Sequence, residues 1–100
     1  MAKRHRVLVS DKISQRALET LQKSNIDFDY TPDCGTSNSL KEVIEPYSGL
    51  IIRSASKVSK DVIDRGKNLQ VIGRAGIGVD NIDLKAASSK GIVVMNTPHG

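Results

Sequence analysis

The protein has 100 residues, of which 38% are hydrophobic, and this is enough for one core but not for two. Much of the formal net charge of +4 comes from the run Lys3-Arg4-His5-Arg6, so no basic face of the kind that binds nucleic acid is visible. Cys34 is the single cysteine, which excludes an intrachain disulfide and favours a reducing, cytoplasmic compartment. No apolar run approaches the roughly 20 residues that span a bilayer. We therefore expect one soluble domain over residues 1–100, without nucleic-acid, membrane or metal partners.

The first third of the chain predicts a strand, a helix and a second strand. Val7–Ser10 is a short apolar run of the kind that forms a buried strand. Ser14–Lys23 is expected to form a helix, because helical spacing places Ile13, Ala17, Leu18 and Leu21 on one face. Ile26–Tyr30 alternates apolar residues with two aspartates, which is typical of an edge or half-buried strand.

The middle of the chain predicts a long loop, a short helix and a buried strand. Thr31–Ser39 is polar and forms the longest expected loop. Ser39 and Glu42 have the spacing of a capping box, so a second helix is expected to begin there and to end near Pro46. Leu50–Arg53 is the next buried strand.

The last part of the chain predicts two more helices and two more buried strands. A helix begins at Ser59 and stops at Gly66, and a strand follows over Val71–Arg74. The last helix begins at Asp80 and ends at Lys90, where Gly91 is a C-terminal signal, and Ile92–Met95 is the final strand.

Five strands that alternate with four helices predict an α/β fold. Connections of this length cross over in the right-handed sense and force a parallel sheet. We expect a flavodoxin-like, doubly wound, five-stranded parallel sheet with helices on both faces, and no domain boundary inside the chain.

Ligands of such sheets collect beyond the carboxyl ends of the strands, where Arg53 and Arg74 lie. Two guanidiniums at one edge suit a phosphate or a carboxylate. The alternative is that each arginine pairs with a nearby acid or lies along the rim of the sheet, and position alone does not separate the two interpretations. Asp11, after the first strand, is interpreted as a turn or cap residue, and neither His5 nor His99 has a partner at a catalytic spacing.

The glycine-rich segment 73–80 lies between a strand and a helix, where bare N–H groups can bind an anion. The alternative is a tight turn that needs glycine only for its geometry. The segment is not a dinucleotide fingerprint, because the frame that starts at Gly76 meets Asn81 where a third glycine is required. Asp83 is the last acid, so no residue is placed to hold a ribose, and a nicotinamide cofactor must be held chiefly by other chain.

Three blocks of the sequence carry a resemblance to a known family: Gly49–Val58 (GLIIRSASKV), Leu69–Leu84 (LQVIGRAGIGVDNIDL) and Lys90–Pro98 (KGIVVMNTP). With their spacing, they resemble the D-3-phosphoglycerate dehydrogenase group of the D-isomer-specific 2-hydroxyacid dehydrogenases. The resemblance extends from about Arg6 to Gly100 and is strongest after Gly49.

The resemblance implies the N-terminal part of a substrate-binding domain in a homo-oligomeric, NAD-dependent enzyme that oxidises 3-phospho-D-glycerate to 3-phosphohydroxypyruvate in serine biosynthesis. The substrate-binding residues that it implies are Arg53, Ser54, Ala55, Arg74, Gly76, Ile77 and Gly78. The N–H groups of Ile77 and Gly78 would hold the substrate carboxylate, and the region of Ile77 would touch the nicotinamide end of NAD. Many relatives have Thr or Val at this position, which leaves a backbone role intact.

The catalytic Arg, Glu and His of the family, with its nucleotide-binding domain, fall beyond Gly100, so the segment alone is expected to be inactive and to expose apolar surface. Other members of the family, acting on glyoxylate, hydroxypyruvate, glycerate or lactate, stay open as alternatives, and two arginines favour the doubly charged phosphorylated acid. A non-catalytic binding module is the other alternative. A phosphoacceptor receiver domain would need an aspartate where this chain has Arg53.

Overall fold

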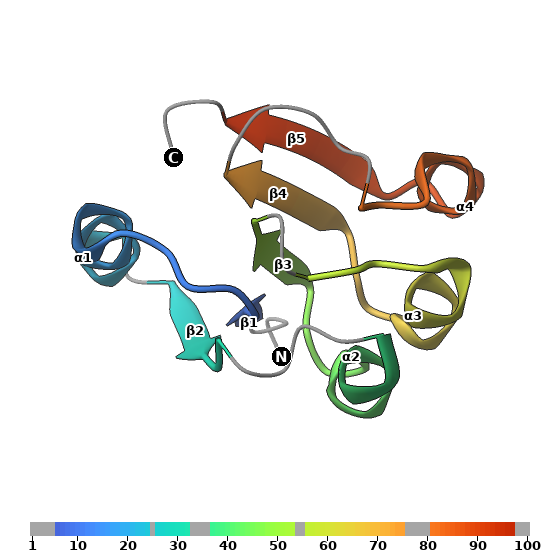
Figure 1. Cartoon of the computed structure of the whole chain (residues 1–100), viewed down its shortest axis with the longest axis horizontal. Coiled ribbons are helices and arrows are strands. Elements are labelled where there is room, and N and C mark those ends of the chain that lie inside the picture. The colour runs from blue at the N-terminus through green and yellow to red at the C-terminus, as the bar shows by residue number, and fades with distance from the viewer. Residues whose placement is uncertain (1–5, 25, 33–36, 54–55, 76–80, 98–100) are drawn as a thin grey trace, which may run out of the picture.

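The computed structural model describes residues 6–24, 26–32, 37–53, 56–75 and 81–97, and they form one five-stranded parallel sheet with four helices (Figure 1). The strand order is β2-β1-β3-β4-β5, the doubly wound order that the alternation of elements predicts. In chain order the elements are β1 (Arg6–Val9), α1 (Gln15–Lys23), β2 (Asp27–Tyr30), α2 (Ser37–Val43), β3 (Gly49–Ile52), α3 (Lys60–Arg65), β4 (Val71–Ala75), α4 (Leu84–Ser89) and β5 (Val93–Thr97).

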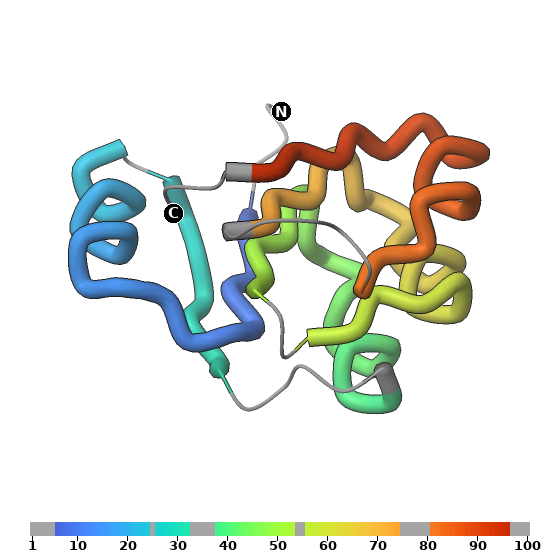
Figure 2. Tube along the Cα trace, turned by 45° about the horizontal axis from the view of Figure 1, so that its top comes forward, coloured from blue at the N-terminus to red at the C-terminus, as the bar shows by residue number. Residues whose placement is uncertain are grey.

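The two faces of the sheet are covered unequally. The chain leaves β1 toward β2 on one side and later moves across β3, β4 and β5 on the other, so right-handed crossovers place α1 on one face and α2, α3 and α4 on the opposite face. Figures 1 and 2 show this arrangement, with α1 alone beside β1 and β2. The prediction of helices on both faces is confirmed, but three of the four share one face.

The main hydrophobic core lies between the sheet and the three-helix side. It joins strand residues to residues of the helices and their ends, such as Leu40 of α2 and Ile44 just after it, both fully buried. Its other large members include Leu50, Ile52, Val62, Ile63 and Ile72. The apolar residues of α1, by contrast, are only half-buried. One well-packed layer therefore holds the fold together, and this layer sets the positions of the strand ends.

The start of α2 differs from its prediction. Ser39 lies inside the helix, which already begins at Ser37, so Ser39 and Glu42 do not form a capping box. The helix also ends at Val43 rather than near Pro46. A helix starting after Ser39 and ending at Val43 would be a single turn, which is too short to be stable, and the earlier start gives the helix seven residues. Residues 37–39 of the expected loop Thr31–Ser39 therefore belong to the helix.

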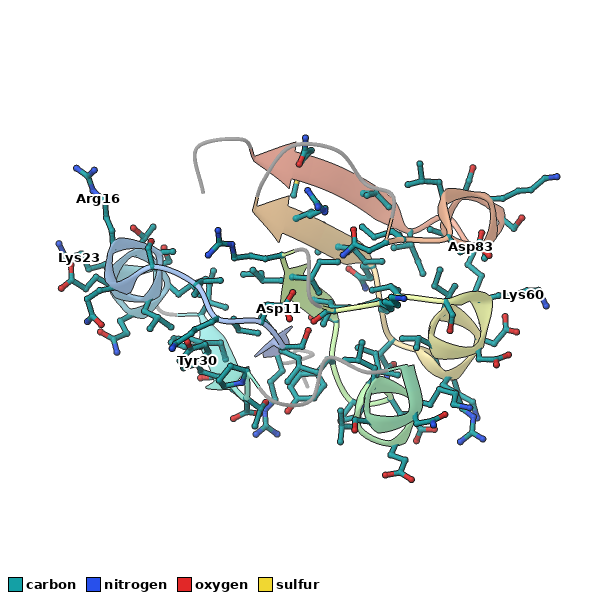
Figure 3. All side chains as sticks on the ribbon, viewed as in Figure 1. Asp11, Arg16, Lys23, Tyr30, Lys60 and Asp83 are labelled. Atoms are coloured by element: carbon teal, nitrogen blue, oxygen red, sulfur yellow. The ribbon has the colours of Figure 1, made fainter. Side chains whose placement is uncertain are left out.

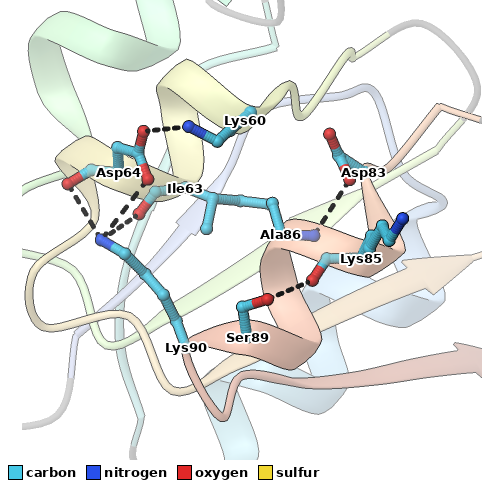
Figure 4. Close-up of polar contacts among 8 residues, drawn as sticks. All are labelled: Lys60, Ile63, Asp64, Asp83, Lys85, Ala86, Ser89 and Lys90. Atoms are coloured by element: carbon cyan, nitrogen blue, oxygen red, sulfur yellow. Dashed lines mark hydrogen bonds and ion pairs between the residues drawn. The ribbon is translucent and has the colours of Figure 1, made fainter.

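The start of α4 also differs from its prediction. Asp83, not Asp80, is the N-cap, and its side chain accepts a hydrogen bond of 3.0 Å from the N–H of Ala86 (Figure 4). The preceding residue, Ile82, pairs with Val58 in a parallel bridge, which needs extended backbone. The helix can begin only after that bridge. Its end is confirmed, because Gly91 follows the cap residue with a φ of 73°.

The last strand was expected to be buried, and this is wrong for one of its faces. Val94 packs against the core, whereas Val93 is 57% exposed and Met95 is 51% exposed. An uninterrupted apolar run has the same appearance whether one or both faces are covered, and no described element lies over this side of β5. None of the helices in the described part of the chain is long and apolar enough to cross a membrane.

Candidate functional site

The carboxyl ends of β1, β3 and β4 meet at one edge of the sheet, and a connected polar cluster fills it. Strand pairing brings Val9 beside Ile51, and Ile52 beside Arg74, so the residues that follow these strands are neighbours in space. Asp11, Ser10 and Ser56 are buried there, with Asp11 only 2% exposed. In Figure 3 Asp11 lies between β1 and β3 at the centre of the molecule, whereas Arg16, Lys23 and Lys60 extend outward.

Asp11 binds the loop that follows β3. One carboxylate oxygen, Oδ2, accepts from the backbone N–H groups of Arg53 (2.7 Å) and Ser56 (2.8 Å). The other oxygen, Oδ1, accepts from the hydroxyl of Ser56 at 2.6 Å. A buried carboxylate is tolerated when such donors replace its water. Asp11 was interpreted as a turn or cap residue, and it does accept backbone N–H groups, but from a loop 42 residues away in sequence.

The hydroxyl groups at this edge have a determined direction. Ser56 Oγ donates its one proton to Asp11, and it lies 2.7 Å from Ser10 Oγ. Because a hydroxyl has a single proton, Ser10 must be the donor in the second contact. The two hydrogen bonds therefore run in one direction: Ser10 donates to Ser56, and Ser56 donates to the carboxylate of Asp11.

Asn81 binds the same loop from its carbonyl side. Its Nδ2 donates to the carbonyl oxygens of Arg53 (2.7 Å) and Ser56 (2.6 Å), and its Oδ1 accepts from Nε of Arg74 at 2.8 Å. The backbone oxygen of Asn81 accepts from Val58 N at 2.8 Å, so the residue is itself held in place. If the side-chain amide of Asn81 were turned over, its NH₂ group would face the Nε–H of Arg74, and two donors would oppose each other.

The two arginines lie at the same edge, as expected, and each donates to a neutral protein acceptor. Arg74 is 9% exposed and its guanidinium binds Asn81. Arg53 is exposed, and one of its terminal nitrogens lies 3.4 Å from the carbonyl oxygen of Lys12 in the loop after β1. Both side chains are thus anchored at the carboxyl ends of the strands, where a doubly wound sheet binds its ligands.

Five of the expected substrate-binding residues, Ser54, Ala55, Gly76, Ile77 and Gly78, lie outside the described residues. The residues on either side of Ser54 and Ala55 are described, however, and Asp11 and Asn81 bind both of them. Asn81 is itself the first described residue after the glycine-rich segment, and its side chain accepts from Arg74, which precedes that segment.

Reasoning from the sequence missed two members of this cluster, Ser56 and Asn81. Asn81 was considered only as a failed glycine of a dinucleotide fingerprint. A usable signal was present, because asparagine and serine side chains bind nearby backbone groups in loops more often than other residues do. Nothing local, however, says that Asn81 binds a loop 25 to 28 residues earlier.

Asn81 stands where a dinucleotide fingerprint starting at Gly76 would have its third glycine, which allows close packing of helix on strand. Its side chain is instead hydrogen-bonded to Arg53, Ser56 and Arg74. Among the described residues no cluster of three His, Cys, Asp or Glu could hold a metal ion.

Comparisons with known proteins agree on one family. The model of the D-isomer specific 2-hydroxyacid dehydrogenase catalytic domain matches residues 7–100. A D-3-phosphoglycerate dehydrogenase of Sus scrofa is 46% identical over 95 residues, which is 95% of this chain and 18% of that protein. A hydroxypyruvate reductase of Thermotoga maritima is 42% identical over 95 residues, or 95% of this chain and 31% of that protein.

A solved structure has the same fold. It is a cofactor (NAD+) bound 3-phosphoglycerate dehydrogenase of Entamoeba histolytica, with a TM-score of 0.80 and 30% identity, covering 92% of this chain and 32% of that one. The chain thus spans about a fifth to a third of the length of these relatives. From the family match over nearly the whole sequence, together with the doubly wound fold, we conclude that the chain belongs to the D-isomer-specific 2-hydroxyacid dehydrogenases.

Proposed function

We propose that the chain is the N-terminal, substrate-binding segment of an NAD-dependent D-3-phosphoglycerate dehydrogenase, which oxidises 3-phospho-D-glycerate to 3-phosphohydroxypyruvate in serine biosynthesis. The observation that carries the proposal is the placement of Arg53 and Arg74 at one sheet edge, joined through Asn81. The relatives of this chain that are named D-3-phosphoglycerate dehydrogenases support the choice of substrate.

The substrate has two anionic groups, a carboxylate and a phosphate, and each suits a guanidinium. An arginine remains charged at any physiological pH and offers a planar set of donors that matches either group. We assign Arg53 and Arg74 to these groups. The neighbouring backbone at Ser54 and Ala55, and at Gly76, Ile77 and Gly78, would supply further N–H donors to the carboxylate.

NAD, in this proposal, is held chiefly by chain beyond this segment, with only the region of Ile77 reaching its nicotinamide end. The cofactor would accept the hydride, and the residues described here would bind and orient the acid. We also propose a cytoplasmic, homo-oligomeric parent, the former in keeping with the single cysteine.

The experiment is a substrate comparison with the complete enzyme and with Arg53→Ala and Arg74→Ala variants. We expect NAD-dependent oxidation of 3-phosphoglycerate with a far higher kcat/KM than of glycerate or lactate. Each single variant should lose roughly tenfold or more in kcat/KM for the phosphorylated acid, because a charge-assisted contact is removed. Equal activity of wild type and both variants would exclude the arginines as substrate ligands.

A second candidate is a reductase of hydroxypyruvate or glyoxylate. The observation that favours it is the 42% identity to the Thermotoga maritima hydroxypyruvate reductase, close to the 46% of the Sus scrofa enzyme. These substrates have one anionic group rather than two. A preference for hydroxypyruvate over its phosphorylated form, with loss of activity on replacing only one arginine, would favour this candidate.

A further inference from the structure

We propose that Asn81 is a positioning residue that orients both Arg53 and Arg74 before substrate binds, with Asp11 holding the opposite side of the Arg53 loop. This inference rests on the proposed function, in which the two arginines bind an anionic acid. Asn81 and Asp11 themselves need not touch the ligand.

Two side chains, those of Asp11 and Asn81, hold the backbone at Arg53 and Ser56. Asp11 accepts from both of its flanking N–H groups, at 2.7 and 2.8 Å. Asn81 donates to both of its flanking carbonyl oxygens, at 2.7 and 2.6 Å. Four hydrogen bonds from two side chains thus fix the backbone from which the side chain of Arg53 starts.

The same asparagine fixes the guanidinium of Arg74. Its Oδ1 accepts from Nε, the nitrogen nearest the aliphatic stem, at 2.8 Å. A hydrogen bond at Nε sets the plane of the guanidinium, and the plane decides which directions the terminal nitrogens face. Arg74 is only 9% exposed, so its constrained side chain has little contact with solvent.

Asn81 is itself held in place by hydrogen bonds of its backbone and its side chain. Its carbonyl oxygen accepts from Val58 N at 2.8 Å, and Asp83 N donates to Val58 O at 2.9 Å, which pairs the segment with the chain just before α3. Both amide protons of the side chain are used. A rigid asparagine therefore couples the ends of β3 and β4, and an arginine ordered in advance loses less entropy when an anion binds.

The test is a set of variants in the complete enzyme, with 3-phosphoglycerate as the ligand. Asn81→Ala should weaken binding by roughly tenfold, seen as a raised KM with a smaller change in kcat. The reason is that the two arginine side chains would then lose their conformational entropy only when substrate binds. The matched control is Asn68→Ala, since Asn68 also donates to a backbone oxygen, Glu45 O at 2.8 Å, but far from the edge. It should leave KM unchanged.

A double-variant cycle separates positioning from general damage. If Asn81 acts through Arg53 and Arg74, then Asn81→Ala should change the affinity by only about twofold in an Arg53→Ala, Arg74→Ala background. An equal loss in both backgrounds would overturn the inference. If Arg53→Ala and Arg74→Ala bind like the wild type, the proposed function itself fails, whereas losses in these variants with normal binding by Asn81→Ala reject only the positioning role.

A measurement on the wild type keeps the inference testable even if Asn81→Ala does not fold. In the enzyme labelled with ¹⁵N-arginine and free of ligand, the Nε–H signal of Arg74 should exchange slowly with water, because that hydrogen is already bound to Asn81. Fast exchange that slows only when 3-phosphoglycerate is added would contradict a preset orientation.

Discussion

At the scale of single residues, the buried carboxylate of Asp11 would destabilise the fold unless hydrogen-bond donors replaced its water. It has three donors, from Arg53 N, Ser56 N and Ser56 Oγ, and almost no contact with water. Each of these donors needs an acceptor in the folded chain because the site is dry. Asp11 therefore contributes to stability as well as to the shape of the candidate site.

We expect Asp11→Ala to lower the free energy of unfolding by about 3 kcal/mol, because it leaves buried donors without an acceptor. The control is Asp64→Ala, whose carboxylate lies 3.4 Å from Lys60 and 3.8 Å from Lys90 in an exposed setting (Figure 4). That change should cost less than about 0.5 kcal/mol. Urea unfolding of the two variants checks the contrast, and equal losses would refute it.

A second residue-level contrast concerns two glycines. Gly91 has a φ of 73°, where an added side chain is strained, while an added Cβ at either Gly91 or Gly73 would meet nothing within 4 Å. Gly91→Ala should therefore destabilise by about 1 kcal/mol through backbone strain alone. Gly73→Ala should be neutral or slightly stabilising. Thermal unfolding of both variants checks this contrast. If Gly73→Ala lowered the melting temperature more than Gly91→Ala, steric crowding rather than backbone strain would be the larger cost.

At the scale of elements, α1 and α3 both have a serine at the N-cap, but only one of the two side chains makes the capping hydrogen bond. Ser14 Oγ accepts from Ala17 N at 3.2 Å at the start of α1. Ser59 occupies the N-cap of α3 without a side-chain bond, and its Oγ is buried with no partner. The sequence predicts both helix starts correctly, because serine at this position favours the extended backbone of a cap.

The expected outcome is that Ser14→Ala costs about 1 kcal/mol in the free energy of unfolding, the usual value of an N-cap. Ser59→Ala should be neutral or stabilising, because it removes a buried hydroxyl that has no partner. Chemical denaturation of both variants gives the comparison. A larger loss for Ser59→Ala would mean that its hydroxyl is satisfied in solution.

At the scale of the whole molecule, the uneven cover of the sheet is the main feature. Val93 and Met95 are about half exposed on one side of β5, and neighbouring Val71 and Gly73 pair with them in register. An edge strand with an apolar open face tends to associate with other chains. The expected exposure of apolar surface therefore has a definite location.

We expect the 100-residue chain to self-associate weakly through this face. The double variant Val93→Lys, Met95→Lys should shift the segment toward monomer in sedimentation velocity, because charge on an edge strand opposes pairing. Leu84→Lys, at a position 45% exposed on α4, is the control and should not change association. Monomeric wild type at high concentration would contradict the prediction.

The sequence by itself determined the number, order and type of the elements, because buried β-branched runs and amphipathic helices leave periodic patterns within a few residues of chain. It also placed Arg53 and Arg74 at the sheet edge, since parallel strands share the direction in which they end. Tertiary structure decided what holds them there. The hydrogen bonds of Asp11 with Arg53, and of Asn81 with Arg53 and Arg74, join residues that are between 7 and 42 positions apart in the sequence. The bridge of Ile82 with Val58 delays the start of α4. Such contacts depend on which strand ends become neighbours, and only the folded chain supplies that information.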